Sequence, residues 1–343
     1  METLNVLEQL FSCPTPSGYE FNAKDLLSDT LRNLVDEVRC DCYGNIIGYK
    51  YAQFRDSAKT VMLVSHLDEI GMMVTHIEND GFIRFSKIGN FDISLLRGRN
   101  VTIHNHKSVK GVVGVPPIYM NKSDSNRNID ISDLWVDIGT NSKQESETLV
   151  EIGDILTVDS YLVPMPNNLV SMRATDDKSG IAAIIGVLSL LKDKQCNCNL
   201  VVVASAQEEI GGIGALAAAL DIKPDVCIAI DVEHATDYPG ANRAKCGDVT
   251  LGNGAVIPVG GDLSLELQKH LKMIAKNNDV YYQSTALPAS SGTDAHKLQI
   301  LRSTTKVGLV SIPCRYMHSP VEIVSVNDIN SVSQLLFKYC CSF

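Results

Sequence analysis

The sequence lacks the features that would place the protein in a membrane, on nucleic acid or outside the cell. Its apolar segments, such as 181–191, are far shorter than the roughly 20 residues that a membrane-spanning helix needs. Acidic side chains outnumber basic ones by 40 to 30, and the net charge of -10 disfavours binding to a phosphate backbone or an anionic membrane. Residues 1–11 contain Glu2 and Glu8 and no basic stretch before an apolar run, so they do not predict a secretory signal. We therefore expect a cytoplasmic protein with no nucleic-acid or membrane partner.

The ten cysteines lack the spacing of a metal or redox motif. One residue separates Cys40 from Cys42 and Cys196 from Cys198, which is neither the zinc-ribbon nor the thioredoxin spacing. In a chain of this size without a secretory signal, cysteines most often stay reduced. The sequence thus predicts free thiols and disfavours a thiolate metal site.

The chain has 343 residues, 45% of them hydrophobic and 20% charged, which allows one large domain and a second, smaller one. Between residues 71 and 159, short β-prone segments are separated by turns, which predicts a small β-barrel or sandwich. The polar stretch 121–128 within this region predicts a mobile loop or a partly disordered insertion. Residues 1–70 and 160–343 predict a single α/β domain, split by that insertion, because helical patterns and apolar strands alternate there.

The strands expected in the α/β domain are short apolar runs, typical of buried strands. They lie at 60–64, 199–204, 226–230, 280–283 and 305–310, after a hairpin at 38–51. The expected helices have apolar residues at helical spacing and lie at 3–11, 26–34, 179–191, 214–220, 263–276, 294–301 and 327–339. In the insertion, strands are expected at 81–88, 100–103, 110–115, 134–138 and 155–158.

Acidic and imidazole residues gather where these strands end. They are His66 and Asp68 after 60–64, Glu208 and Glu209 after 199–204, Asp231 after 226–230, His318 after 305–310, and Asp176 and Asp177 before a helix. In open α/β sheets, ligands bind beyond the carboxyl ends of the strands. Imidazole and carboxylate without thiolate suit zinc, cobalt or manganese, and one carboxylate can bridge two such ions. The pattern predicts a site for two divalent metal ions.

Two of these segments indicate more specific roles. Adjacent carboxylates such as Glu208 and Glu209 are costly to bury unless a cation compensates them. One can then bind metal while the other takes a proton from the attacking water and later donates it to the leaving amine. In the extended segment His66-Leu67-Asp68 the first and third side chains share a face. We therefore expect Asp68 to accept a hydrogen bond from the second ring nitrogen of His66.

Each residue taken alone has an ordinary explanation: a structural histidine for His66, a helix N-cap for Asp176-Asp177, a solvated turn for Glu208-Glu209, another cap for Asp231, and a loop histidine near Glu322 for His318. Their joint occurrence at strand ends on one side of one sheet favours the metal site. His104 and His106 are interpreted as surface residues of the insertion. The sequence leaves the roles of His234 and His296 undecided.

Six segments carry a family resemblance: Ser65-His66-Leu67-Asp68-Glu69-Ile70-Gly71, Asp176-Asp177-Lys178-Ser179-Gly180, Gln207-Glu208-Glu209-Ile210-Gly211, Asp231-Val232-Glu233-His234-Ala235, Gly292-Thr293-Asp294-Ala295 and Arg315-Tyr316-Met317-His318-Ser319-Pro320. In this order they resemble the dinuclear metallo-aminopeptidases of metallopeptidase family forty-two, which include glutamyl aminopeptidases and the tetrahedral TET aminopeptidases. The resemblance covers nearly the whole chain. It implies a three-layer α/β/α metallopeptidase domain with a mixed, mostly parallel sheet, plus an inserted small β-barrel that mediates dimerisation.

The resemblance also implies the activity and the role of each site residue. Asp176 would bridge two metal ions, with His66 and Asp231 completing one site and Glu209 and His318 the other. Glu208 would be the general base in removing the N-terminal residue from peptides. Asp68, placed beside the site by its spacing to His66, is expected to support the catalytic residues. The implied ions are zinc, or cobalt or manganese, and the implied assembly is a homo-oligomer of dimers, up to a hollow tetrahedral dodecamer.

Two other functions were weighed against this one. A metal-independent glycoside hydrolase would use paired carboxylates, but the adjacent Glu208 and Glu209 are poorly placed to flank one glycosidic bond. A catalytically inactive scaffold would keep the fold for assembly, but the complete set of ligand residues argues against it. The sequence does not determine whether the preferred N-terminal residue is acidic, aliphatic or basic.

Overall fold

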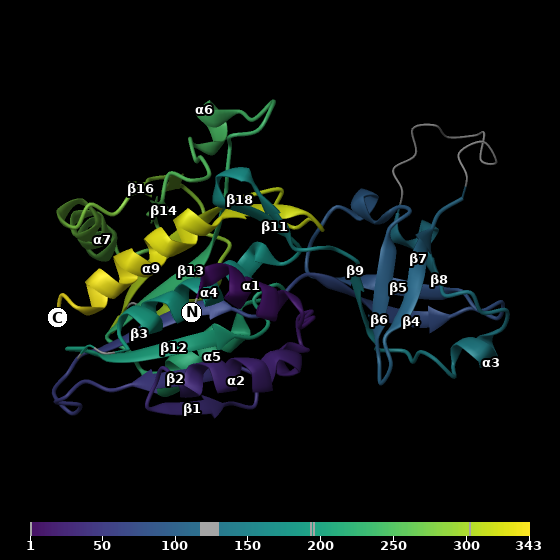
Figure 1. Ribbon diagram of the computed structural model, residues 1–343, viewed down its shortest axis with the longest axis horizontal. Helices are drawn as coiled ribbons and strands as arrows, with labels where there is room; N and C mark the ends of the chain where they lie inside the picture. The colour runs from purple at the N-terminus through teal and green to yellow at the C-terminus, as the bar shows by residue number, and fades with distance from the viewer. Residues whose placement is uncertain (1, 117–129, 193, 195, 302) are drawn as a thin grey trace.

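Figure 1 shows a computed structural model of the chain, which describes residues 2–116, 130–192, 194, 196–301 and 303–343. A larger body of sheet and helices lies beside a smaller barrel. The loop predicted at 121–128 falls outside the described residues. Within the described ranges, no helix is both long and apolar enough to cross a membrane. The ten cysteines are free, and the Sγ atoms of Cys196 and Cys198 lie 3.2 Å apart.

The body is built on a mixed sheet whose four central strands are parallel. From edge to edge its strands are β1 (Glu37–Cys40), β2 (Ile46–Lys50), β12 (Asn199–Ser205), β3 (Thr60–His66), β13 (Val226–His234), β18 (Lys306–Arg315), β19 (Glu322–Ser325), β11 (Leu169–Met172) and β10 (Val163–Met165). The pairs from β12 to β18 are parallel, and the outer pairs are antiparallel. β14 (Ala255–Val256) and β16 (Tyr282–Gln283) extend the sheet beside β18. The expected mixed sheet is confirmed, with parallel pairing concentrated at its centre.

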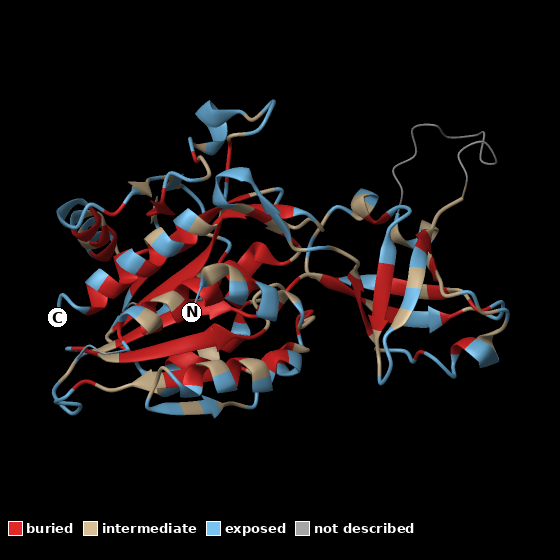
Figure 2. Ribbon diagram, viewed as in Figure 1, coloured by how far each residue is buried: buried red, intermediate tan, exposed pale blue. Residues whose placement is uncertain are grey.

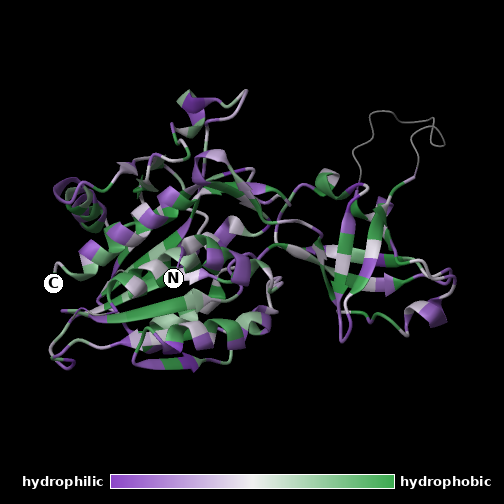
Figure 3. Cartoon of the chain, in the orientation of Figure 1, coloured by the Kyte–Doolittle hydropathy of each residue, from purple (hydrophilic) through white to green (hydrophobic). Residues whose placement is uncertain are grey.

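Helices cover both faces of this sheet. One face packs against α1 (Thr3–Phe11), α2 (Lys24–Arg32), α4 (Thr175–Leu190), α7 (Leu265–Asn277) and α9 (Val326–Cys340), and the other against α5 (Ile213–Ile222) and α8 (Asp294–Leu298). In β3, Leu63 belongs to the first core and Met62 and Val64 to the second. A strand covered on both sides must be apolar throughout, since successive side chains point to opposite faces. The central strands are accordingly buried in Figure 2 and hydrophobic in Figure 3.

The smaller part is a closed barrel with a core of its own. Around the barrel its strands are β4 (Gly71–Ile77), β5 (Ile83–Ile88), β8 (Trp135–Asp137), β7 (Val109–Gly114), β6 (Asn100–His104) and β9 (Ile155–Val158). A separate apolar cluster that includes Met72, Val101, Val136 and Leu156 fills its interior. The insertion therefore forms a barrel and not a sandwich. The short helix α3 (Lys143–Ser146) lies between β8 and β9 in the chain.

Several elements differ from the sequence-based expectation. β4 precedes the first strand expected in the insertion, and β10, β11 and β19 were not expected. β10 is an exposed three-residue edge strand that contains Pro164, a residue that argues against a strand in the sequence. α8 ends at Leu298 and is followed by a 3₁₀ turn over Gln299–Leu301, where one helix was expected. Further short elements are α6 (Arg243–Cys246), β15 (Val259–Gly260), β17 (Ala286–Leu287) and several 3₁₀ turns.

Candidate metal centre

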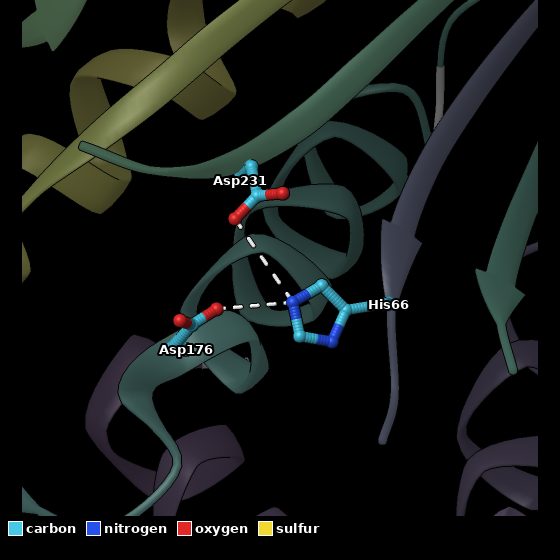
Figure 4. Close-up of side chains that lie close together, drawn as sticks. All are labelled: His66, Asp176 and Asp231. Atoms are coloured by element: carbon cyan, nitrogen blue, oxygen red, sulfur yellow. Dashed lines mark hydrogen bonds and ion pairs between the residues drawn. The ribbon is translucent and has the colours of Figure 1, made fainter. Parts of the chain in front are cut away.

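The acidic and imidazole residues expected at strand ends converge at the carboxyl edge of the parallel strands. By element, they are His66 at the end of β3, Asp231 in β13, Glu208 and Glu209 after β12, His318 after β18, and Asp176 in the first turn of α4. Figure 4 shows the side chains of His66, Asp176 and Asp231 turned toward one another. Five segments far apart in the sequence thus meet in one place.

Two groups of three side chains have the donor atoms and spacing that a metal ion needs. In the first, Nε2 of His66 lies 3.0 Å from Oδ1 of Asp176 and 3.9 Å from Oδ1 of Asp231. In the second, Nε2 of His318 lies 3.2 Å from Oδ2 of Asp176 and 3.3 Å from Oε1 of Glu209. Within each group the donor atoms lie within 4.8 Å of one another. Asp176 belongs to both groups and turns a different oxygen to each.

The centre is acidic and largely buried. Burial, reinforced by the nearby Asp231, raises the pKa of Glu208 to about 10. Burial also opposes the charge of Asp176, but hydrogen bonds with His318 and His66 hold its pKa below the ordinary value. Carboxylates at this density are costly to bury without a compensating cation. Nitrogen and oxygen donors without sulfur fit zinc, cobalt or manganese, so the residues present suit a pair of divalent ions.

Asp68 contacts His66, but its carboxylate does not accept the hydrogen bond that the sequence predicted. Nδ1 of His66 lies 3.0 Å from the backbone oxygen of Asp68 and 3.6 Å from its carboxylate. That carboxylate instead accepts hydrogen bonds from the backbone N–H groups of Glu208 (3.0 Å) and Glu209 (3.1 Å), and from the Ser17 hydroxyl. The expectation failed because β3 ends at His66, so the side-chain alternation of a strand does not continue to Asp68. Asp68 holds the turn that presents the two glutamates.

Glu322 was not expected in the centre, although it ties two of its segments together. It is buried at the start of β19. Its carboxylate accepts hydrogen bonds from the backbone N–H of Asp176 (3.1 Å), the hydroxyl of Thr175 (3.0 Å) and the backbone N–H of His318 (2.8 Å). Burial, with Asp176 nearby, raises the pKa of Glu322 to about 8. The only signal in the sequence was its position shortly after His318.

A buried ion cluster next to the centre also escaped the sequence analysis. Oε1 of Glu69 lies 2.8 Å from Nζ of Lys178, and its Oε2 lies 3.2 Å from Nε of Arg173. Burial disfavours the charge of Glu69, but Arg173 and Lys178 outweigh it and lower its pKa to about 2. The cluster joins the segment that follows His66 to the start of α4, which contains Asp176.

The histidines left outside the site have different environments. His104 in β6 is partly buried, with Nε2 2.8 Å from Oγ1 of Thr157, and burial lowers its pKa to about 4. It is not the exposed surface residue that was expected, because its ring lies against Thr157 of the neighbouring strand β9. His106 is exposed, as expected. Nδ1 of His296 lies 3.6 Å from Oδ2 of Asp262.

Both ligand groups line one cavity of about 390 Å³. Glu208 lies in its wall together with the ligand residues. The rest of the wall includes Glu233 and His234 at the end of β13, and Leu287 and Met317 from two other segments. Small-molecule sites occupy roughly 300–1,000 Å³, so the cavity has room for one residue of a substrate beside the ligand groups.

The family follows from comparison with known proteins. The family model described as M42 glutamyl aminopeptidase matches residues 44–335. The chain belongs to this family. A relative from Pyrococcus furiosus, a lysyl aminopeptidase, is 32% identical over 335 residues, which cover 96% of this chain and 94% of that protein.

Solved structures of similar proteins have the same architecture. Aminopeptidase APDkam598 from the archaeon Desulfurococcus kamchatkensis matches with a TM-score of 0.92 and 30% identity over 99% of this chain and 95% of that one. The Pyrococcus horikoshii TET1 peptidase, which can assemble into a tetrahedron or a large octahedral shell, matches with a TM-score of 0.87 and 27% identity, covering 99% and 100%. The family and fold class expected from the six segments are confirmed, and membership of the family supports an aminopeptidase.

Proposed function

We propose that the protein is a metal-dependent aminopeptidase that removes the N-terminal residue from peptides. The observation that carries the proposal is Asp176, whose two carboxylate oxygens face two separate groups of nitrogen and oxygen donors. A carboxylate placed in this way suits a bridge between two ions. The relationship to M42 aminopeptidases supports the same reaction class.

The ligand residues divide between two ion positions. His66 and Asp231 would hold one ion, Glu209 and His318 the other, and Asp176 would be shared. When bound, the two ions would polarise the scissile carbonyl and acidify the attacking water. Zinc, cobalt and manganese all suit these ligands.

Glu208 acts as the general base in this proposal. Its side chain lines the cavity beside the ligand residues and belongs to neither ligand group. With the ions bound, their positive charge would offset the burial and the nearby Asp231 that raise its pKa, so its carboxylate could take a proton from the attacking water and donate it to the leaving amine. Asp68 is a positioning residue, because its carboxylate holds the backbone N–H groups of Glu208 and Glu209.

We also propose that the chain forms homo-oligomers. The barrel, residues 71–159, would mediate dimerisation, and the catalytic domain, residues 1–70 and 160–343, would face the interior of a tetrahedral dodecamer. The assembly of the similar TET1 peptidase supports this arrangement. Light scattering after size exclusion tests it, and a monomeric chain would contradict it. The cytoplasmic location expected from the sequence remains a prediction.

The rival functions account for less of the site. A glycoside hydrolase needs two carboxyls on opposite sides of one bond, whereas Glu209 lies 3.3 Å from His318 and Glu208 is its neighbour in the chain. An inactive scaffold has no need to bury several carboxylates together, at the cost that this entails.

Metal content and peptidase activity test the proposal together. Elemental mass spectrometry on the purified protein should find about two divalent ions per chain, and a chelator should abolish cleavage of aminoacyl p-nitroanilides. Protein without bound metal, inactive even after zinc or cobalt is added, would favour the scaffold. Chelator-resistant cleavage of a glucan would favour the glycoside hydrolase.

The neighbours Glu208 and Glu209 provide a matched pair of variants. Glu208→Gln should lose most turnover while it retains both ions, because the base is no ligand. Glu209→Gln should lose turnover and metal together. Near-normal turnover by Glu208→Gln would show that the base is wrongly assigned.

A further inference from the structure

Glu233 lies in the cavity wall and has no part in the proposed chemistry. It is two residues beyond Asp231 in β13, and both side chains line the cavity. Side chains two apart in a strand share a face and are separated by about 6.6 Å along it. Glu233 therefore lies one strand repeat beyond a proposed metal ligand, on the same side of β13.

The surroundings of Glu233 favour a cation with an apolar stem. Within the described part of the chain, the cavity wall contains no lysine or arginine, and its histidines form no ion pair with Glu233. The apolar side chains Leu287 and Met317 lie in the same wall. Lysine and arginine bury their methylene stems against such surfaces and pair their charged ends with carboxylates. An acidic N-terminal side chain would instead meet a like charge.

We propose that Glu233 selects peptides whose N-terminal residue is lysine or arginine, by pairing with the cationic end of that side chain. This inference rests on the proposed aminopeptidase function and gives it a substrate class. The substrate's first side chain lies along Leu287 and Met317, and its ammonium or guanidinium group meets the Glu233 carboxylate.

Glu233 also makes local hydrogen bonds, which define the competing interpretation. Its Oε1 accepts from the backbone N–H of His234 at 3.1 Å, and its Oε2 accepts from the Thr285 hydroxyl at 3.4 Å. A purely structural carboxylate would use these contacts to hold the end of β13. Alternatively, the carboxylate would bind the α-ammonium group that every peptide substrate carries.

The test compares lysine with norleucine, which has the same apolar stem and no side-chain charge. The metal-loaded enzyme is assayed with lysyl, arginyl, norleucyl and glutamyl p-nitroanilides. Wild type should prefer the two basic substrates, and Glu233→Gln should lower the lysyl-to-norleucyl ratio of kcat/KM by about 10-fold or more, since a charged hydrogen-bonded contact is lost. Glu233→Asp should restore part of the ratio. Glu8→Gln, an exposed acid-to-amide change in α1, is the matched control and should leave the ratio as in wild type.

Three results would overturn the inference. Equal losses of lysyl and norleucyl cleavage in Glu233→Gln would mean a structural or α-ammonium role. A wild-type preference for the glutamyl substrate would exclude a cation site. Thr285→Val changing the ratio as much as Glu233→Gln would indicate that the hydrogen bond at the end of β13, and not the charge, matters.

Calorimetry separates failure of this inference from failure of the proposed function. Wild type should bind lysinamide more tightly than norleucinamide, and Glu233→Gln should remove the difference. If the protein cleaves no amide but binds in this way, the proposed function fails and the cation site stands. Equal binding of the two amides by wild type overturns the cation site whether or not the enzyme is active.

Discussion

The body and the barrel differ in what they bury. In the body, charged side chains are enclosed near the strand ends, among them Asp68, Asp176 and Asp231. In the described part of the barrel, the buried polar residues are neutral, namely Thr102, Ser146 and Thr157. Burying charge costs several kcal/mol per ion unless it is compensated. The interior of the body is therefore shaped by the chemistry of its site, whereas that of the barrel is mainly apolar with a few neutral, hydrogen-bonded polar groups.

The largest effect is expected on enzymatic activity, which should be lost by a substitution in the body and kept by one in the barrel. Asp176→Asn removes a carboxylate shared by both ligand groups, so both ions should bind weakly and kcat/KM should fall by more than about 100-fold, beyond the loss typical of an outer-shell partner. His104→Gln removes a partly buried histidine of the barrel and should leave metal content unchanged. Elemental analysis and p-nitroanilide assays check both. Loss of metal from His104→Gln would show that metal binding also depends on the barrel.

The next effect concerns the buried ion cluster of the body. Glu69→Gln leaves Lys178 enclosed without its counter-ion and should lower the free energy of unfolding by about 3–5 kcal/mol. Urea unfolding followed by circular dichroism measures it.

The pH dependence of that loss has a definite sign. The pKa of Glu69 falls from its ordinary value of 4.5 to about 2 on folding. Its stabilising effect is therefore present above about pH 4.5 and is lost as the pH falls toward 2. The difference between wild type and Glu69→Gln should shrink over this range. A difference that stayed constant would mean that packing, and not charge, is responsible.

Shortening a buried side chain in either apolar core should lower the free energy of unfolding about as much as Glu69→Gln. Each substitution reports on one part of the molecule. Leu63→Ala in the body and Leu156→Ala in the barrel each remove a fully buried side chain, at about 2–5 kcal/mol. The single tryptophan, Trp135, lies in the barrel with its ring centroid 6.0 Å from that of Phe82. The fluorescence of Trp135 should change at a lower urea concentration in Leu156→Ala than in wild type. An equal response in Leu63→Ala would show that body and barrel unfold together.

The smallest effect is expected on the barrel surface. Oε1 of Glu78 lies 2.8 Å from Nε of Arg84, and about a third of each side chain is exposed. Such pairs contribute little because water screens them, so Glu78→Gln should change stability by less than about 1 kcal/mol. Thermal unfolding measures it. A loss as large as that of Glu69→Gln would remove the distinction between the two parts.

Sequence alone determined the order of the elements and the candidate ligands. The apolar runs of β3, β12, β13 and β18 were recognisable because strands covered on both faces need apolar residues at every position. Parallel strands end at one edge of a sheet, so residues such as His66 and Asp231 were expected to meet. β10 and β19 were missed because they are only three and four residues long, and β19 has polar residues at both ends although it is buried.

Tertiary structure decided which atoms face one another. No spacing in the sequence indicates that Asp176 turns one oxygen to each ligand group, that Asp68 holds the N–H groups of Glu208 and Glu209, or that Glu322 lies behind two ligand segments. These contacts join residues far apart in the chain, and their geometry depends on strand register and on where each strand stops. Periodicity determines which face of an element is buried, but only the packed fold determines what that face meets.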